Sequence, residues 1–163
     1  KTTQQKYNIY NVKSIKMAKN RKVKNIDSLL EKTFSEKRNE KIIYEIGDVN
    51  RKVSSAIFKD CGIELSDYKH IIDNYAILHI IKNHGDAVKE KRRNQLPVTI
   101  DYFKKIKSII SNPDNVYYDG KNKIGRDVIV YEKKFNDTVI YVEEIRTGRK
   151  QLATNSMRIK KAP

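Results

Sequence analysis

The sequence is poor in cysteine, in apolar residues and in long apolar runs, and these shortages exclude whole classes of protein. Cys61 is the only cysteine among 163 residues, so a disulfide framework and a cysteine-based zinc site cannot form. Hydrophobic residues make up 38% of the chain. No stretch approaches the roughly 18 apolar residues that a membrane helix needs, and the polar N-terminus is unlike a signal peptide. A membrane-spanning protein and a small disulfide scaffold are therefore excluded.

Acidic residues are missing from both ends of the chain. Residues 1–24 contain no Asp or Glu, and none follows Glu144. Against 35 Lys and Arg there are 20 Asp and Glu, which gives a formal net charge of +15. Such an excess predicts a polyanionic partner. Nucleic acid is the leading candidate, followed by an anionic membrane surface or an acidic protein. The plain alternative is a basic, solvated surface without a partner.

Two patterns common in nucleotide-binding proteins and nucleases are also missing. The segment 120–125, GKNKIG, lacks the terminal Lys-Ser/Thr and the strand–helix context of a P-loop. Metal-dependent DNA cleavage requires clustered carboxylates, whereas the adjacent Glu143 and Glu144 point to opposite faces of a strand. We therefore predict no metal site and no cofactor. The inward glutamate, for which we take Glu143, is a candidate general base, and the alternative is that both glutamates simply pair with nearby lysines.

Hydrophobic periodicity divides the chain into a helical first part and a β-rich second part. Residues 1–24 are predicted to be a basic linker, or alternatively an arm that contacts phosphates. The other predicted elements are helices at 26–38, 48–59, 66–85 and 99–111, a charged connector at 87–96, and strands at 41–46, 116–120, 127–135, 138–146 and 151–159. We expect an α+β fold, with N-terminal helices packed on a small antiparallel sheet of about four strands. Residues 1–40 would be a basic N-terminal appendage and residues 41–163 the main domain.

Two of the three histidines lie in the stretch 75–85, YAILHIIKNHG, at the end of the predicted central helix. Histidine has an unperturbed pKa near neutrality, so His79 and His84 are candidates to accept and donate protons. We expect His79 to point toward the core side of the helix. His84 should lie at the helix C-terminus, where the helix dipole favours a protonated imidazole. The alternative for each is structural, as a core histidine with satisfied hydrogen bonds or as a helix cap.

RNA cleavage without a metal needs a base for the 2′-hydroxyl proton, an acid for the leaving oxygen, and cations for the charge on the phosphorane. The two histidines can serve as base and acid, and the sequence does not decide which is which. Charge could be stabilised by Arg146 and Lys150, and the hydroxyl of Thr154 or Ser156 could orient the phosphate. Further basic residues give the predicted sheet a phosphate-binding end: Arg149, Arg158, Lys160 and Lys161.

Five motifs follow one another in a recognisable order. They are YEIGDV at 44–49, HIIKNHG at 79–85, LPVTIDYFKKIKSIISNPDNV at 96–116, the pair VIVYEKK and VIYVEEIR at 128–134 and 139–146, and LATNSMRIKK at 152–161. Together they resemble the phage-associated branch of the barnase–EndoU–colicin–RelE-like nuclease superfamily, over about the last three quarters of the chain. The resemblance implies a helix–sheet nuclease fold, in which His79 matches the helix histidine and Ser156 the last-strand hydroxyl. Arg146 and Glu143 are weaker matches, and Arg158 departs from the family by replacing a tyrosine.

The same resemblance implies a function. It suggests metal-independent RNA cleavage that leaves a 2′,3′-cyclic phosphate, carried out by the C-terminal toxin domain of a phage-derived or secreted polymorphic toxin. We predict a ribonuclease toxin with tRNA as the leading substrate, because a strongly basic face can bind tRNA by its shape and phosphates. A cognate immunity protein and a host translation factor are the expected protein partners. The effector would be secreted or phage-delivered and act in the cytoplasm of the target cell.

Two other functions fit the composition. The first is a non-catalytic RNA- or DNA-binding module, in which removing charge weakens binding while His79→Ala has no effect. The second is a virion or scaffold interaction module whose charge merely packs against nucleic acid. That module would not turn over RNA and would bind any polyanion in a salt-sensitive manner.

Overall fold

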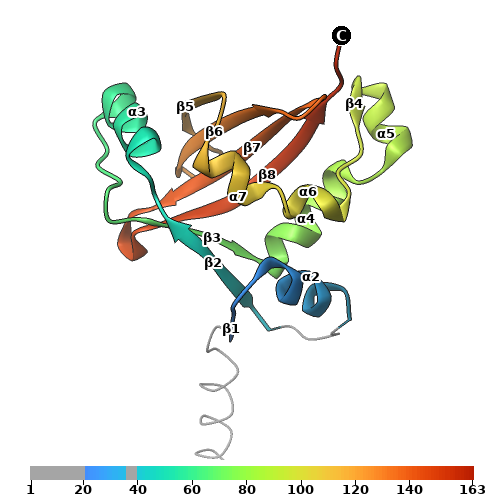
Figure 1. Cartoon of the computed structure of the whole chain (residues 1–163), viewed down its shortest axis with the longest axis horizontal. Coiled ribbons are helices and arrows are strands. Elements are labelled where there is room, and N and C mark those ends of the chain that lie inside the picture. Colours follow the sequence, from blue (N-terminus) through green and yellow to red (C-terminus); the bar gives the residue numbers. More distant parts are fainter. Residues whose placement is uncertain (1–20, 36–39) are drawn as a thin grey trace, which may run out of the picture.

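The protein has an α+β fold in which helices pack on one large mixed sheet (Figure 1), as seen in a computed structural model that describes residues 21–35 and 40–163. Residues 1–20 of the predicted linker at 1–24, and residues 36–38 at the end of the first predicted helix, lie outside these residues. The strands are β1 Arg21–Val23, β2 Ile42–Asp48, β3 Lys69–Asp73, β4 Gln95–Leu96, β5 Asn115–Lys121, β6 Asp127–Lys134, β7 Thr138–Arg146 and β8 Gln151–Lys160. The helices are α2 Ile26–Ser35, α3 Arg51–Cys61, α4 Asn74–His84, α5 Ala87–Arg92, α6 Ile100–Phe103, α7 Ile106–Ser111 and the 3₁₀ turn η1 Thr147–Arg149.

The sheet is larger than predicted and is not purely antiparallel. Its strand order is β1-β2-β3-β8-β7-β6-β5, with β4 paired to the end of β8, which makes eight strands. The predicted hairpins of β5 to β8 are confirmed as an antiparallel meander. The other half is joined to it by parallel pairing of β3 with β8, in the register His70 to Leu152. The prediction of about four strands was too low, because β1, β3 and β4 were not predicted as strands.

The first part of the predicted central helix is wrong. Residues Lys69–Asp73 form strand β3, and α4 starts only at Asn74. Asp73 caps the helix, because its Oδ1 accepts a hydrogen bond from the backbone N–H of Ala76 at 2.8 Å. Ile71 and Ile72 belong to different hydrophobic clusters, since successive strand residues face opposite sides of a sheet. An apolar run this short is compatible with either a strand or a helix.

Other helix boundaries differ from the prediction by a few residues. Helix α3, predicted at 48–59, is capped by Asn50, whose Oδ1 accepts a hydrogen bond from Val53 N–H at 2.9 Å. Gly62 ends this helix in the left-handed conformation, with φ of 78°. The predicted helix at 99–111 is split into α6 and α7, and the charged connector at 87–96 contains α5 and β4.

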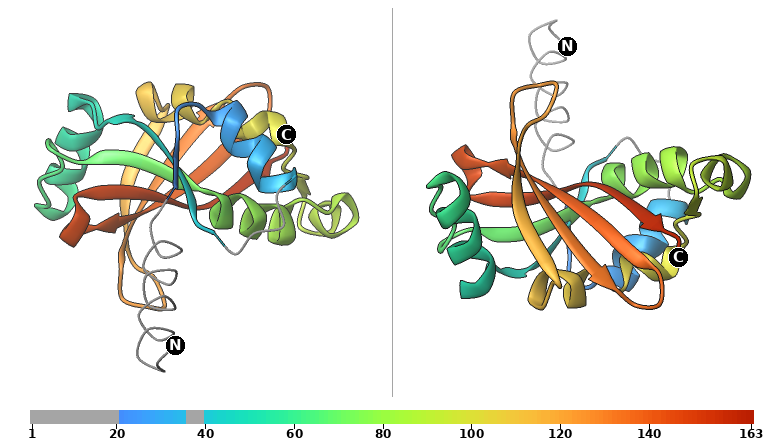
Figure 2. Two further views of the ribbon diagram at one scale, coloured as in Figure 1. Left: turned by 90° about the horizontal axis from the view of Figure 1, so that it is seen from below. Right: turned by 90° about the horizontal axis from the view of Figure 1, so that it is seen from above.

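The two faces of the sheet have different surroundings. The first, which we call the helix face, carries the main core, to which α2, α3, α4, α6 and α7 all contribute side chains. The second face carries a separate small cluster of Val128, Val130, Ile140 and Val142 with Tyr117 packed against it. Within the described residues, no helix contributes to this small cluster. Figure 2 shows α2 and α7 on one side of the sheet, whereas the tip of the β5–β6 hairpin extends beyond the other side.

Part of the predicted N-terminal appendage belongs to the packed body. Leu29 and Leu30 of α2 are buried in the main core together with residues of the strands. Strand β1 pairs in parallel with β2, so residues from 21 onward extend the sheet. The proposed boundary at residue 40 therefore separates sequence regions that share one core.

Candidate functional site

Helix α4 takes the place of β3 beside the second half of β8, and this brings His79 close to the sheet. Strand β3 pairs with β8 only as far as Ile71 opposite Ala153, and α4 then packs against β8. Ile77 and Ile80 of α4 are fully buried in the core. His79 is exposed on the other side of the helix, together with Tyr75, which is 45% exposed. The prediction that His79 points toward the core is therefore wrong.

His79 lies in an open depression of about 430 Å³, which we call the His79 groove. Its lining comes from α4, from the ends of β2 and β3, and from β7 and β8: Lys41, Asp73, Tyr75, Ala76, His79, Glu144, Arg146, Thr154 and Asn155. The side-chain amide nitrogen of Asn83, one helical turn later, lies 3.1 Å from Nε2 of His79. The structure thus brings together the predicted residues His79, Arg146 and Thr154.

The carboxylate of Glu144, which lines this groove, binds two arginines, and one of them, Arg146, also lines the groove. Glu144 Oε1 accepts hydrogen bonds from Arg126 Nη1 at 2.9 Å and from Arg146 Nε at 2.8 Å. The glutamate is only 5% exposed, and such charge-assisted bonds are short and directional. The two guanidinium groups are therefore fixed side by side by one oxygen atom.

A β-bulge completes this arrangement. Between β7 and β8 the register places Val142 opposite Ser156 but Glu143 opposite Thr154, which leaves Asn155 as the extra residue. The side-chain amide of Asn155 lies 3.4 Å from Oε2 of Glu144. Bulges commonly redirect a side chain beside a functional site. Here the bulge turns Asn155 toward the carboxylate that holds the arginines.

Glu143, the predicted general base, points inward and is fully buried. Its carboxylate lies 2.8 Å from Nδ1 of His70 and accepts hydrogen bonds from the hydroxyls of Tyr131 at 2.5 Å and Tyr141 at 3.1 Å. Burial, and next the negative charge of Glu143, raise the pKa of both tyrosine hydroxyls well above their usual value. A substrate in the groove cannot reach this carboxylate, and Glu144 is the glutamate that faces it.

His70, which the sequence analysis did not single out, is the partner of Glu143. The imidazole is 1% exposed, and its Nε2 has no hydrogen-bond partner within the described chain. The only sequence signal was a histidine beside an apolar pair in a segment predicted to be helical. Its pairing with Glu143, 73 residues away, depends on the non-local contact between β3 and the meander.

Three other predicted residues lie outside the groove or face away from it. His84 Nδ1 lies 3.3 Å from the buried carboxylate of Glu90, in a cluster that also includes Arg93. Ser156 is on the second face of the sheet, opposite Val142, and does not line the groove. Thr154 lines the groove, but its hydroxyl lies 2.5 Å from the hydroxyl of Tyr141 on the buried side.

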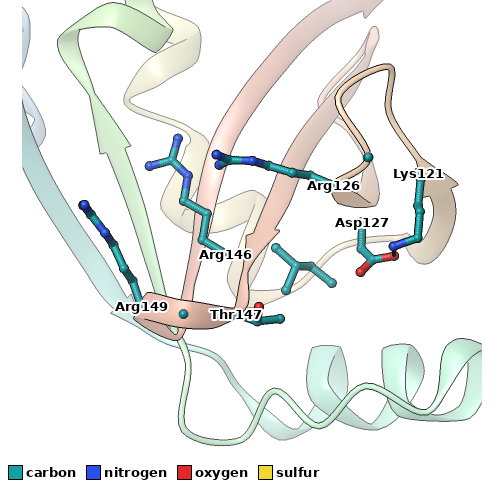
Figure 3. A pocket seen from close by; sticks show the side chains of 9 residues that line it. Lys121, Arg126, Asp127, Arg146, Thr147 and Arg149 are labelled. Atoms are coloured by element: carbon teal, nitrogen blue, oxygen red, sulfur yellow. Dashed lines mark hydrogen bonds and ion pairs between the residues drawn. The ribbon is translucent and has the colours of Figure 1, made fainter.

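The predicted basic residues fall into two groups, one before the start of β8 and one near its end. Arg146 and Arg149 line a second depression of about 440 Å³, which we call the basic pocket. Its complete lining is Lys121, Gly125, Arg126, Asp127, Ile145, Arg146, Thr147, Gly148 and Arg149 (Figure 3). Lys150 instead binds Asp67 at 2.5 Å, which lowers the pKa of that carboxyl.

Arg158 and Lys160 lie further along β8. Arg158 is close enough to Tyr117 for its charge to act on the pKa of that hydroxyl, which burial raises. Lys160 lines a separate depression with Lys134 and Lys161. Because a strand rises about 3.3 Å per residue, the ten residues of β8 separate its two ends by roughly 30 Å.

Metal-binding clusters and membrane-spanning helices are both absent from the parts of the chain that the structure describes. No group of three or more His, Cys, Asp or Glu residues there could hold a metal ion. No helix in the same residues is long and apolar enough to cross a membrane.

Comparison with known proteins identifies one family. A family model for a phage-Barnase-EndoU-ColicinE5/D-RelE like nuclease 3 matches residues 46–162, well over half of the chain. Neither curated proteins nor solved structures give a match. The matched segment includes α4, the β5–β8 meander and every residue of the His79 groove except Lys41. The chain therefore belongs to the phage-Barnase-EndoU-ColicinE5/D-RelE like nuclease 3 family.

Proposed function

We propose that the chain is a metal-independent endoribonuclease and that the His79 groove is its active site. The observation that carries this proposal is one juxtaposition. An exposed imidazole shares a groove with Arg146, whose guanidinium is fixed by Glu144. Proton transfer and stabilisation of charge on a phosphate are the two tasks that RNA cleavage requires of side chains.

In this mechanism, His79 accepts the proton of the ribose 2′-hydroxyl. The 2′-oxygen then attacks the neighbouring phosphorus, and the bond from phosphorus to the 5′-oxygen breaks, which leaves a 2′,3′-cyclic phosphate. We assign protonation of the leaving 5′-oxygen to Tyr75, because its phenol lines the groove one helical turn before His79. His84 does not line the groove, so it has no role in this scheme.

Arg146 supplies the positive charge. A guanidinium can donate two parallel hydrogen bonds to a phosphate, and it remains charged at any physiological pH. Because Glu144 and the bulge residue Asn155 hold Arg146 and Arg126 in place, little reorganisation is needed when the phosphorane forms. The two glutamates of β7 therefore have separate duties: Glu144 positions the arginines and Glu143 stabilises the core.

We further propose that this nuclease is a toxin that acts on tRNA. The net charge of +15 suits a large polyanion, and the cationic residues near the two ends of β8 would contact phosphates roughly 30 Å apart. Cells that make such an enzyme would require an immunity protein that covers the His79 groove. The toxin would be delivered by phage or by secretion and would act in the cytoplasm of a target cell. A host translation factor would assist it there.

The test uses purified protein and total bacterial RNA in excess EDTA, with products resolved on a denaturing gel. Wild type is compared with His79→Ala, with Tyr75→Phe and with the control His84→Ala, which removes an imidazole from the same helix outside the groove. We expect discrete fragments from wild type and from the control, and a loss of roughly 100-fold or more in His79→Ala.

Other results would change the assignment. Equal cleavage by wild type and His79→Ala would remove the catalytic role of the groove. If every protein leaves RNA intact even after addition of cell extract, while all of them bind it with the same salt dependence, the chain is a binding module.

A further inference from the structure

We propose that the basic pocket is a second phosphate-binding subsite, which holds the phosphate next to the scissile one along the RNA strand. This inference rests on the proposed function, because the scissile phosphate is taken to lie in the His79 groove. It makes the substrate class more specific: the enzyme would act on RNA with at least two successive phosphates, and poorly on a dinucleotide with one.

Two loops form the walls of the basic pocket. One wall is the turn of the β5–β6 hairpin, where Asn122 Oδ1 accepts hydrogen bonds from the backbone N–H of Ile124 at 3.2 Å and of Arg126 at 3.0 Å. Gly125, with φ of 83°, allows this tight turn. The opposite wall is the η1 turn after β7, which contributes Thr147 and Arg149. Figure 3 shows Arg126 extending from the hairpin toward Arg146, with Arg149 beyond it at the turn.

The charges that line the pocket favour an anion. Four cationic side chains, Lys121, Arg126, Arg146 and Arg149, face a single carboxylate, Asp127. That carboxylate is already bound by the hydroxyl of Tyr118 at 2.6 Å and by Nζ of Lys121 at 3.2 Å. In the described parts of the chain, no carboxylate pairs with Arg149, so its guanidinium can receive a ligand.

The lining also argues for a phosphate and against a nucleobase. Ile145 is the only large apolar side chain among the lining residues, and none of these residues is aromatic. Bases bound by proteins are usually stacked on aromatic rings, whereas phosphates are held by arginine, lysine and hydroxyl groups. Thr147, which lies beside Arg149 in the pocket, adds such a hydroxyl.

The pocket is contiguous with the His79 groove. Arg146 lines both depressions. Arg126 lies on the pocket side, and Glu144 Oε1 binds Arg126 and Arg146 at 2.9 and 2.8 Å. An RNA backbone whose scissile phosphate contacts Arg146 would therefore bring its next phosphate to Arg126 and Arg149.

The experiment uses substrates with one cleavable bond, so that the position of the RNA is defined. Wild type is given a dinucleoside monophosphate, NpN, and the same compound with a terminal phosphate at either end, pNpN and NpNp. We expect one of the two terminal phosphates to raise kcat/KM at least tenfold. Arg149→Ala should lose most of this gain. Lys123→Ala, which removes one charge from the exposed tip of the same hairpin outside the pocket, should keep the gain.

A binding measurement separates failure of this inference from failure of the proposed function. Calorimetry on His79→Ala uses uncleavable 2′-deoxy analogues of the three compounds, and compares them with the double variant that also carries Arg149→Ala. Tighter binding through the terminal phosphate, lost in the double variant, supports the subsite even if no protein cleaves RNA. Equal binding of the three compounds would overturn the subsite, and so would an equal effect of Lys123→Ala and Arg149→Ala on the gain in kcat/KM.

Discussion

Glu143 and Glu144 are neighbours in the sequence, yet they lie in opposite surroundings. Glu143 is 0% exposed and is bound by His70 and two tyrosine hydroxyls on the helix face. Glu144, on the second face, lines the His79 groove and is bound by Arg126 and Arg146. The alternation of a strand alone produces this difference. The comparison shows that two adjacent glutamates can differ in role. One stabilises the core, whereas the next holds arginine side chains in place.

Removal of Glu143 should have the largest effect, and this effect should be on stability. Glu143→Ala leaves His70 and two buried hydroxyls without their shared acceptor, and breaking a buried ionic cluster costs about 3–5 kcal/mol. Urea unfolding followed by circular dichroism would measure this loss. Glu143→Gln keeps the shape and part of the hydrogen bonding, so its loss should be smaller. A stability of Glu143→Ala equal to wild type would show that the buried cluster contributes nothing.

Removal of Glu144 should instead reduce activity with little loss of stability. In Glu144→Ala the two arginines can turn to water, since Arg126 is 45% and Arg146 21% exposed. The misplaced guanidiniums should lower kcat roughly 100-fold, with a loss of about 1 kcal/mol or less in unfolding free energy. Glu132→Ala, a glutamate of β6 outside the groove, is the matched control. If Glu144→Ala unfolded as easily as Glu143→Ala, the contrast between the two glutamates would be lost.

The bulge residue should have a more modest effect. Asn155→Ala removes one hydrogen bond to Glu144, worth about 1 kcal/mol, and should lower kcat about fivefold. Single-turnover kinetics would isolate the chemical step. Asn115→Ala, an exposed asparagine at the start of β5, serves as the control. An unchanged kcat in Asn155→Ala would mean that the two arginines alone fix Glu144.

Loss of the hydrogen bond to a third carboxylate, Asp127 of the basic pocket, should have the smallest effect. It should change how the unfolding free energy depends on pH. Its hydrogen bond from Tyr118 lowers the pKa of Asp127 below 3.8 and raises the pKa of Tyr118 from 10.0 to about 12. The depressed carboxyl stabilises the fold above its unfolded pKa and loses this contribution as pH falls through the folded value. The raised phenol contributes below pH 10 and loses its contribution as pH rises toward 12.

The variant Tyr118→Phe tests this expectation. The difference in unfolding free energy between wild type and variant should be constant at neutral pH, and should shrink at both extremes. If the difference in unfolding free energy does not vary with pH, the hydrogen bond to Asp127 makes no pH-dependent contribution to stability.

Local patterns in the sequence were enough to predict some elements and not others. The strands from β5 to β8 were predicted within about two residues, because their apolar residues alternate over long runs bounded by turns. Strand β3 was missed, because its five residues adjoin an apolar helix and its pairing with β8 joins segments about 80 residues apart. Periodicity carries no information about such non-local pairing.

The candidate site was predicted unevenly for the same reason. The opposite orientation of Glu143 and Glu144 follows from alternation and is confirmed by the structure. The exposure of His79 was not predicted, because the helix buries Ile77 and Ile80, which leaves His79 and Tyr75 on its exposed side. Arg126 was also missed, because it reaches Glu144 only through the fold of the hairpin.

The central place of β8 in the sheet has a consequence for how the protein is made. The last strand in the sequence lies between β3 and β7, and it also supplies Thr154 and Asn155 to the groove. A ribosome must therefore release almost the whole matched segment before the two halves of the sheet can join. Until then, the nascent chain has an unpaired edge on both β3 and β7 and no assembled groove. The proposed active site is therefore absent while the chain is still being synthesised.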